Sequence, residues 1–410
     1  MKEKTKQLFT GVFKSFCNFN YLKILFQSAS PKELKRNIRT IAVDNVEFDI
    51  EPYKEFLSSN SKKVLLVSQE LSWTGAPMAL LNLAKHLQKK DNEVFIFSLI
   101  DGPLRSEFEN INIPVKVFNF FNYNKLQVLP FIKQFDFAIA NTCISYEFVK
   151  FFEDEIPLIW WIHEAKTLES YVKKNKNFRK TLKKAKNIYV GTTYTKSFIE
   201  KYNSNVSQLT YFLDEFDRYD FEKTSKMNFS IIASIDERKA QDVVIDAIFQ
   251  LPQVYLDKVE FNFIGIGATF YQKLKEKTKN TKEIKWHGLI KNKEEYRQKL
   301  SQTDVLICVS RDDPDPIVVT EACMLGIPCI VSKNVGQCEY INDFENGFIV
   351  ETENSSALAE TIKKIVDNRD LLDKIGENAK EIYQKNYTKE IFDKRLTSIL
   401  KENKNRGKND

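Results

Sequence analysis

Short, continuous apolar runs alternate with helical stretches along most of this 410-residue sequence. Amphipathic segments such as residues 77–90 separate most of the runs in the first half. Strands that are apolar at every position are typical of parallel sheets whose two faces are both covered by helices. In the first half, the expected strands are residues 64–67, 94–99, 115–118, 137–140, 158–162 and 188–190.

Residues 215–227 are polar and aperiodic, and the alternation restarts after them. Two consecutive units of this kind predict an α/β fold with two Rossmann-like, doubly wound domains that face a cleft, and such sheets bind ligands at the carboxyl ends of their strands. The second set of expected strands is residues 229–233, 259–264, 284–286, 305–309, 329–331 and 348–350. The expected helices of this half are residues 239–251, 269–279, 293–302, 317–325, 355–367, 369–384 and 388–402. The expected organisation is an N-terminal helical extension (1–60), a first domain (61–214), a linker (215–227), a second domain (228–385) and a C-terminal helix with its tail (386–410).

The first 40 residues are basic, because nine lysines and arginines against two glutamates give +7, while the whole chain carries +6. Phe9, Phe13 and Phe16 recur there at helical spacing. Such a helix can lie on an anionic membrane surface or pack on the rest of the chain with its lysines in solvent, and we favour packing. The modest net charge gives no argument for a nucleic-acid partner.

No apolar run approaches the roughly 20 residues of a membrane span, so we expect a cytoplasmic protein that can lie at the inner face of the cell membrane. The six cysteines form no C-x-x-C pair and are scattered through apolar segments. We therefore expect free, buried thiols, with neither disulfides nor a zinc site.

Residues 310–321 follow an expected strand and open an expected helix. Pro316 suits the first helical turn, where its missing N–H does no harm. The amides of Ile317 and Val318 would then point outward at the positive end of the helix dipole, where phosphate binds readily. Glu321, one turn further on, could accept hydrogen bonds from a sugar diol. Asp313 and Asp315 could equally be plain helix-capping carboxylates, so the residues alone leave both interpretations open.

This stretch resembles the Glu-x7-Glu motif of family-four GT-B glycosyltransferases, with Asp313 in the first acidic place and Glu321 in the second. Residues 322–332 and the turn 346–348 are similar to the family's continuation, and the resemblance covers about residues 62–403. It implies a retaining transferase in which the second domain binds a nucleotide sugar and the first presents a glycan or lipid-linked acceptor. It also implies a role in bacterial surface polysaccharide synthesis, with no essential metal and no cofactor beyond the donor.

The resemblance assigns donor contacts in the second half. Lys239 matches the lysine that clamps the donor diphosphate, and Arg238 could replace the arginine that relatives carry nearer the start of this loop, where this chain has Ser234. Gly265 and Gly267 match a G-x-G after the second strand, although tight packing would explain them equally well.

His287 lies in the segment 286–290 that, by resemblance, faces the nucleotide base, although we favour a surface histidine at a strand end.

In the first half, Gly75 joins the first strand to its helix in a loop that the family places near the donor phosphate and the acceptor. Glycine allows a ligand to approach the backbone closely. His163, followed by Glu164, resembles a histidine that contacts the transferred sugar, and a structural histidine at a strand end is the alternative. The expected catalytic residues are His163, Asp313 and Lys239, and the expected donor-binding residues are Gly75, Arg238, Lys239, Gly265, Gly267, His287, Ile317, Val318 and Glu321.

Several positions depart from the family pattern. Ser234 replaces an arginine, Asp313 is one methylene shorter than glutamate, and Pro316 and Ala240 stand where glycine is expected. The departures at Ser234, Asp313 and Pro316 leave open a non-catalytic subunit that binds a glycan or a partner enzyme. A nucleotide-sugar epimerase with the same two-domain plan is a second alternative. A dehydrogenase is disfavoured because the loop over residues 69–75 lacks G-x-G-x-x-G. Residues 313–315 also mimic a D-x-D metal motif, which their late position in the chain disfavours.

Overall fold

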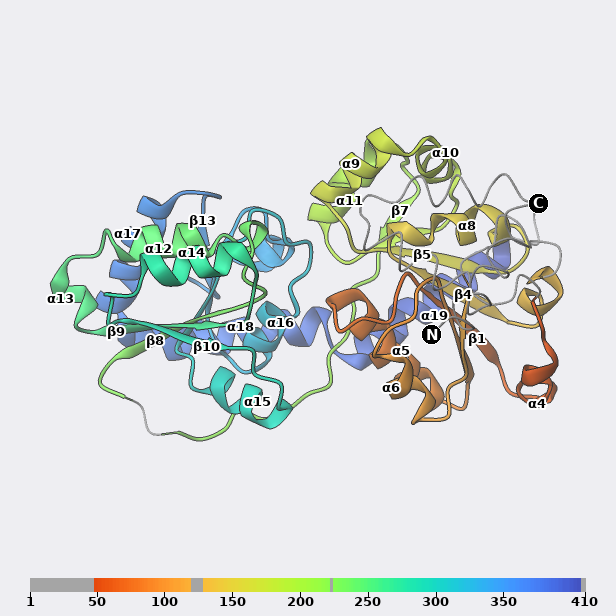
Figure 1. The fold of residues 1–410 in the computed structure, drawn as a ribbon, viewed down its shortest axis with the longest axis horizontal. Coiled ribbons are helices and arrows are strands. Elements are labelled where there is room, and N and C mark those ends of the chain that lie inside the picture. The colour runs from red at the N-terminus through yellow and green to blue at the C-terminus, as the bar shows by residue number, and fades with distance from the viewer. Residues whose placement is uncertain (1–47, 119–127, 222–223, 407–410) are drawn as a thin grey trace, which may run out of the picture. The chain divides into compact units, whose positions relative to one another are not determined.

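The computed structural model describes residues 48–118, 128–221 and 224–406 (Figure 1). The helix expected within residues 1–40 lies outside them. The chain divides into two compact units. Unit 1 contains the described residues up to Ile162 together with Asn175–Ile188, and unit 2 contains His163–Lys174 and the described residues from Tyr189 onward. Among the described residues, no helix has both the length and the apolar character that crossing a membrane requires.

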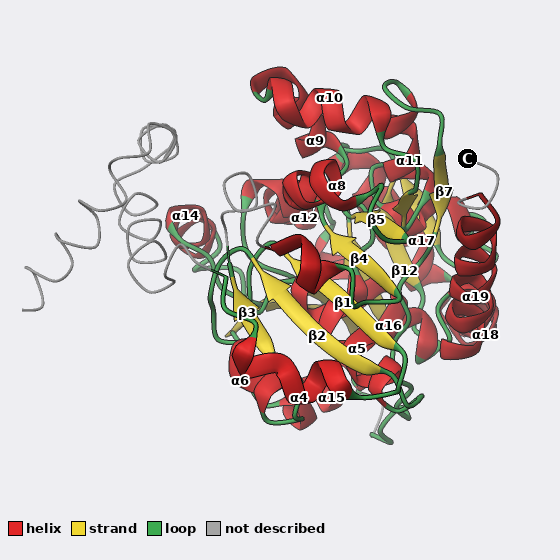
Figure 2. Ribbon diagram, turned by 90° about the vertical axis from the view of Figure 1, so that its right-hand side faces the viewer, coloured by secondary structure: helices red, strands yellow, loops and turns green. Residues whose placement is uncertain are grey.

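Unit 1 is built on a parallel sheet whose first five strands lie in the order β3-β2-β1-β4-β5. The strand β1 is buried at every position, as its uninterrupted apolar sequence predicts. Helices α5 and α6 cover one face of the sheet, and α8 and α10 cover the other (Figure 2). The elements of this unit are η1 (Glu51–Tyr53), α4 (Lys54–Ser58), β1 (Lys63–Ser68), α5 (Gly75–Gln88), β2 (Glu93–Ser98), α6 (Arg105–Glu109), β3 (Val115–Val117), β4 (Phe137–Asn141), η2 (Cys143–Ser145), α8 (Tyr146–Phe152), β5 (Leu158–Ile162) and α10 (Lys176–Lys184).

Phenylalanines fill much of the unit 1 core. Phe95 and Phe97 of β2 are fully buried and pack against Phe131, with ring centroids 5.0 and 6.4 Å apart. Phe135 packs edge-to-face on Phe95 at 5.9 Å. Aromatic pairs of this kind add stabilisation beyond that of their buried area, so these rings strengthen the packing of β2 in the core of unit 1.

Two further strands, β6 (Ile188–Val190) and β7 (Val206–Gln208), extend the order to β3-β2-β1-β4-β5-β6-β7. The sequence did not predict β7, because only the first of its three residues is apolar and buried. Two helices of unit 2 lie in this part of the chain: α9 (Lys166–Lys174) precedes α10, and α11 (Thr193–Glu200) lies between β6 and β7 in sequence.

Unit 2 is built on a six-stranded parallel sheet in the order β10-β9-β8-β11-β12-β13. Helix α12 packs against α17 and α16 against α18, on opposite faces of this sheet (Figure 1). Phe229, Phe261 and Phe263 are fully buried in its core. Its elements are β8 (Met227–Ile232), η3 (Glu237–Lys239), α12 (Gln241–Ile248), α13 (Gln253–Leu256), β9 (Val259–Ile264), α14 (Thr269–Lys277), β10 (Ile284–Gly288), α15 (Lys293–Ser301), β11 (Val305–Cys308), α16 (Ile317–Met324), β12 (Cys329–Ser332), η4 (Gly336–Tyr340), β13 (Phe348–Val350), α17 (Ser355–Asp367), η5 (Arg369–Leu371), α18 (Leu372–Asn386) and α19 (Lys389–Arg406).

Part of the segment expected to be a linker is attached to α15. Arg218 donates hydrogen bonds to the carbonyls of Ser301, at 3.1 Å, and Thr303, at 2.8 Å. The amide of Tyr219 donates to Ser301 Oγ at 3.1 Å. These bonds satisfy carbonyls at the end of the helix, which have no partner within it.

The expected alternation of strands and helices is confirmed, with every expected strand present within two residues of its expected ends. The described cysteines form no disulfide, as expected; Cys17 lies outside the described residues. Four of them are buried and one is half-buried, namely Cys143, Cys308, Cys323 and Cys329, and Cys338.

Candidate functional site

The strand order of unit 2 reverses at β8. From β8 the chain moves outward through β9 and β10 and then returns to the other side of β8 as β11. The connections that leave β8 and β11 therefore start side by side at the carboxyl edge of the sheet. In open α/β sheets this reversal point is where ligands bind. The two connections carry Arg238, Lys239 and Asp313.

Lys239 forms an ion pair with Asp313 Oδ2. Arg238 Nη1 lies 3.5 Å from Asp313 Oδ1 and donates a hydrogen bond to the Asp312 carbonyl at 2.9 Å. The side chains of Lys239 and Asp313 are 14% and 8% exposed, whereas that of Arg238 is 41% exposed. The structure thus brings together three predicted site residues, and the guanidinium of Arg238 remains accessible to an incoming anion.

Local hydrogen bonds set the position of Lys239. The Asp236 carboxylate caps η3 by accepting from the Lys239 amide at 3.2 Å, and Ser234 Oγ donates to Asp236 at 2.7 Å. Ala240 then adopts a left-handed conformation, with φ 57° and ψ 34°, before α12 begins. The left-handed conformation costs a residue other than glycine about 1–2 kcal/mol. The backbone at position 240 would therefore favour glycine, where this chain has alanine.

Asp313 is held in place through its backbone. Its amide donates to the Asn334 carbonyl at 3.1 Å, and its carbonyl accepts from the Gly336 amide at 2.9 Å. Ser310 Oγ also donates to the carboxylate, at 3.4 Å. The carboxylate is therefore fixed at the end of β11 whether or not a ligand is present.

The N-terminus of α16 follows directly after this carboxylate. Pro316 is the N-cap residue, one position earlier than expected, with φ −65° and ψ 120°. The amides of Ile317 and Val318 are free of acceptors in the part of the chain that the structure describes. Two unpaired N–H groups at a helix N-terminus suit an anionic group.

Glu321, in the second turn of α16, accepts a hydrogen bond at Oε2 from the hydroxyl of Tyr296 in α15. Desolvation raises the pKa of Glu321 to about 7, although this hydrogen bond favours the ionised form. Burial raises the pKa of the Tyr296 phenol as well. Sequence reasoning missed Tyr296, because no motif distinguishes it from the other residues of an amphipathic helix.

Asp315 differs from Asp313 in its surroundings. Its Oδ1 accepts from Gln337 Nε2 at 2.7 Å and from the Tyr387 hydroxyl at 3.0 Å. Desolvation raises the pKa of Asp315 well above its ordinary value. The two carboxylates of the D-x-D-like segment thus have different partners. Among the described residues, no group of three or more His, Cys, Asp or Glu side chains could hold a metal ion.

His163 directly follows β5 and is half-buried. Desolvation lowers its pKa to about 4, so the imidazole is neutral at neutral pH. Three residues further on, the Lys166 amide lies 3.4 Å from Asp312 Oδ1, which also accepts from the Tyr194 hydroxyl at 3.0 Å. The segment that carries His163 is therefore bonded to the residue beside Asp313.

Gly265 and Gly267 lie where two backbones meet. A Cβ at Gly265 would overlap the Ala233 carbonyl, and φ of Gly265 is +143°. A Cβ at Gly267 would likewise overlap the Ile235 carbonyl, and these two residues form a parallel bridge. The packing explanation for this G-x-G is therefore confirmed, while a part in donor binding stays a prediction.

His287 and Gly75 are the remaining predicted site residues. His287 has its Nε2 2.6 Å from Asn262 Oδ1, on β9, and partial desolvation of the imidazole lowers its pKa. Gly75 is the first residue of α5 in unit 1, following Thr74 in an extended conformation.

Two family models match adjoining parts of the chain. The model described as "Glycosyl transferases group 1" matches residues 214–382, and the model described as "Glycosyl-transferase family 4" matches residues 60–227.

Curated relatives match shorter segments. An uncharacterized glycosyltransferase of Methanocaldococcus jannaschii is 28% identical over 162 residues, which is 38% of this chain and 44% of the relative. The lipopolysaccharide core biosynthesis glycosyltransferase LpsE of Rhizobium meliloti is 25% identical over 166 residues, 40% of this chain and 46% of the relative. The alignments thus span less than half of each of these relatives.

Solved structures share the fold over most of the chain. The Anabaena protein HepE, crystallised with UDP and glucose, superposes with a TM-score of 0.71 at 18% identity, over 83% of this chain and 99% of HepE. At this identity the likeness establishes the two-sheet architecture and nothing further.

Proposed function

The chain belongs to the glycosyltransferases of group 1 and family 4, and on that basis we propose that it transfers a sugar from a nucleotide-sugar donor to a glycan or lipid-linked acceptor. LpsE acts in lipopolysaccharide core biosynthesis and the Staphylococcus aureus relative CapM in capsular polysaccharide biosynthesis, according to their names. These names support bacterial surface polysaccharide synthesis as the setting. The proposal includes retention of configuration and a cytoplasmic location, with membrane contact through residues 1–40 as the alternative to the packing that we favour.

One observation carries the proposal, the convergence of Arg238 and Lys239 on Asp313 beside the N-terminus of α16. Breaking a glycosidic bond to a nucleoside diphosphate leaves negative charge on the departing phosphate. Two cations and the amides of Ile317 and Val318 would stabilise that charge as it develops. Lys239 would exchange its contact with Asp313 for the phosphate, which frees Asp313 for hydroxyls of the donor sugar.

Glu321 would accept hydrogen bonds from the ribose diol of the donor. Only the ionised carboxylate offers acceptor sites on both oxygens, and one of them is already taken by Tyr296. His163 would contact the transferred sugar in its neutral form, because its pKa lies well below 7. Gly75, Gly265, Gly267 and His287 complete the proposed donor site by family resemblance alone.

The proposal is tested by a turnover screen. The full chain is incubated with UDP-, GDP- and ADP-sugars, with and without a mixed bacterial glycan acceptor, and the release of nucleoside diphosphate and the fate of the sugar are both followed. Acceptor-dependent release of one nucleotide supports the transferase. Conversion of the donor sugar without acceptor would show an epimerase, and binding of no donor would show a non-catalytic subunit.

A further inference from the structure

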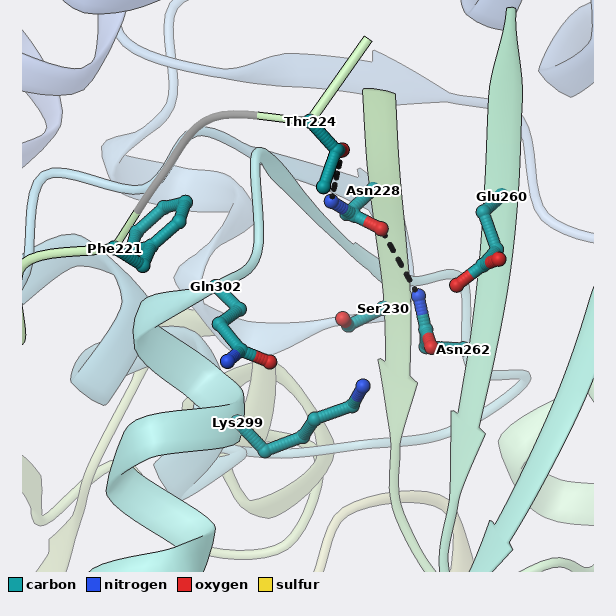
Figure 3. Close-up of a pocket in the computed structure, with 8 residues that line it drawn as sticks. All are labelled: Phe221, Thr224, Asn228, Ser230, Glu260, Asn262, Lys299 and Gln302. Carbon is teal, nitrogen blue, oxygen red and sulfur yellow. Dashed lines mark hydrogen bonds between the residues drawn. The ribbon is translucent and has the colours of Figure 1, made fainter. Parts of the chain in front are cut away.

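One face of the unit 2 sheet is polar over part of its width. Asn228 and Ser230 of β8 lie level with Glu260 and Asn262 of β9, and all four point to the same side (Figure 3). The residues between them, such as Phe229 and Phe261, point to the other side and are buried in the core. Strands in the middle of a parallel sheet are normally apolar on both faces, so these four polar residues need a separate explanation.

They line a pocket of about 290 Å³ that Lys299 and Gln302 close from α15 and its C-terminal end (Figure 3). Its strand residues lie in the amino-terminal and middle parts of β8 and β9, whereas Lys239 follows the carboxyl end of β8. The pocket is therefore distinct from the cluster of Lys239 and Asp313, while its Asn262 contacts His287, which family resemblance assigns to the donor site. All the residues that line it belong to unit 2: Phe221, Thr224, Asn228, Ser230, Glu260, Asn262, Lys299 and Gln302.

Some of these polar groups already have partners. Asn228 donates to Thr224 Oγ1 at 3.2 Å, and Asn262 donates to Asn228 Oδ1 at 3.5 Å. Ser230 Oγ lies 2.7 Å from Thr303 Oγ1. These bonds hold the two asparagines in fixed orientations, which prepares the pocket wall before a ligand arrives.

Other polar groups of the pocket have no such bonds. Within the described part of the chain, the Lys299 ammonium, the Glu260 carboxylate and the side-chain amide of Gln302 make neither a hydrogen bond nor an ion pair. Figure 3 shows the Lys299 side chain reaching between α15 and the strands, toward Ser230 and Asn262. An ammonium and a carboxylate on opposite walls leave room for a ligand that accepts from one and donates to the other.

The charges and the size of the pocket indicate the class of ligand. The charges of Lys299 and Glu260 cancel. The Glu260 carboxylate would repel a phosphate, and the Lys299 ammonium would repel a cation, so an uncharged ligand fits best. A sugar hydroxyl both donates and accepts, which suits a wall of amides, an ammonium and a carboxylate. The volume holds about ten waters at roughly 30 Å³ each, close to the dozen or so non-hydrogen atoms of a hexose. Phe221 adds an aromatic ring to the lining, and ring faces pack well on apolar C–H surfaces.

We propose that this pocket is a second carbohydrate site, which binds one neutral hexose unit apart from the donor site. For a ligand of this size we expect a dissociation constant of about 1–10 mM. Binding is weak because each hydrogen bond between sugar and protein replaces a hydrogen bond that the sugar made with water. Such a site would hold a glycan while chemistry takes place elsewhere. The proposal does not depend on the donor assignment.

The test is ligand-observed saturation-transfer NMR on the full chain with glucose, galactose, mannose and N-acetylglucosamine. The variants Lys299→Met and Glu260→Gln change the pocket, Lys273→Met on exposed α14 is the matched control, and Arg238→Met changes the donor site at an accessible side chain. We expect at least one sugar to bind to the wild type, to Lys273→Met and to Arg238→Met. Each pocket variant should weaken that binding tenfold or more, while its thermal unfolding stays unchanged.

Three results would overturn the proposal. The first is that none of the sugars binds to the wild type at about 50 mM, which is at least five times the expected dissociation constant. The second is that sugar binding is lost in Arg238→Met but kept in both pocket variants, which assigns it to the donor site. The third is that inorganic phosphate binds and Lys299→Met alone abolishes that binding, which makes the pocket an anion site.

Discussion

The hydroxyl of Tyr296 in α15 donates a hydrogen bond to Glu321 in α16, the carboxylate that we propose for the ribose of the donor. Desolvation of this carboxylate raises its pKa to about 7, while the tyrosine's hydrogen bond acts in the opposite direction. The acceptor capacity of the proposed donor site therefore changes within the neutral pH range. Strongly shifted pKa values of this kind are typical of functional sites.

Donor affinity should depend on pH around 7. Below this pH Glu321 is protonated and loses acceptor sites, so we expect the affinity for the nucleotide-sugar donor to fall about tenfold between pH 8 and pH 6. Titration calorimetry at several pH values measures this, with an intact nucleotide sugar as the ligand because its diphosphate does not titrate in that range. Tyr296→Phe should move the midpoint to higher pH, since the hydrogen bond that favours ionisation is gone. An equally steep pH dependence in Glu321→Gln would contradict this prediction.

The same carboxylate should destabilise the fold at alkaline pH. Its pKa is raised from 4.5 to about 7 on folding, so folding favours the protonated form, and the associated stability is lost as pH rises through 7. Glu321→Gln should therefore raise the free energy of unfolding at pH 8 by roughly 1–3 kcal/mol and leave it nearly unchanged at pH 4.5. Urea unfolding at the two pH values measures the difference, and an equal effect at both would show that Glu321 is not the titrating group.

Loss of the Lys239–Asp313 ion pair should be costly for both stability and catalysis. Lys239→Met or Glu321→Ala should reduce the rate of sugar transfer by about 10²- to 10³-fold, because each removes a group that acts on the leaving nucleotide.

Asp313→Asn should also destabilise unit 2 by roughly 3–5 kcal/mol, since it leaves Lys239 poorly solvated and without its carboxylate. The double variant Lys239→Met with Asp313→Asn should be less destabilised than the sum of the single variants.

Lys277 and Asp246 form the matched control for this prediction. They are also a lysine–aspartate pair in unit 2, but their side chains are 44% and 49% exposed. Removing either partner should change the free energy of unfolding by less than about 1 kcal/mol. Equal destabilisation from breaking the buried and the exposed pair would contradict the special role of the buried one.

Two glycines with positive φ should respond differently to alanine. At Gly288, with φ +70°, a Cβ would meet nothing within 4 Å, so the substitution should cost only the backbone strain of about 1–2 kcal/mol. At Gly265 the added Cβ would also overlap the Ala233 carbonyl, which is backbone and cannot turn aside. Gly265→Ala should therefore cost at least about 3 kcal/mol, or lower the yield of folded protein. Thermal unfolding of the two variants side by side decides this, and equal melting temperatures would disprove it.

The sheets could be predicted because their strands are continuous apolar runs. The runs 64–67 and 158–162 are examples, and each appears as a buried strand. Strand β7 could not be predicted, since a three-residue strand with one buried residue has no distinguishing pattern. The polar wall of the pocket left a trace in the sequence, because Asn228 and Ser230 alternate with apolar residues where a parallel strand should be apolar throughout.

The residues of the candidate site could be predicted from the sequence where they belong to a family motif. Lys239 and Asp313 were named from sequence, and the structure pairs them. Tyr296 was not, because its contact with Glu321 depends on how two helices pack, which no short pattern encodes. The burial of Asp315 among Gln337 and Tyr387 likewise depends on segments far apart in the sequence.

The most direct measurement is calorimetric titration of UDP, GDP and ADP into four proteins: the wild type, Lys239→Met, Glu321→Ala and the exposed control Lys277→Met. It tests whether Lys239 and Glu321 hold a nucleotide at the carboxyl edge of the unit 2 sheet. We expect one of the three nucleotides to bind the wild type and the control equally, and to bind each of the other two variants at least tenfold more weakly. Failure of all three nucleotides to bind the wild type, or equal affinity in all four proteins, would contradict the donor site proposed for this chain.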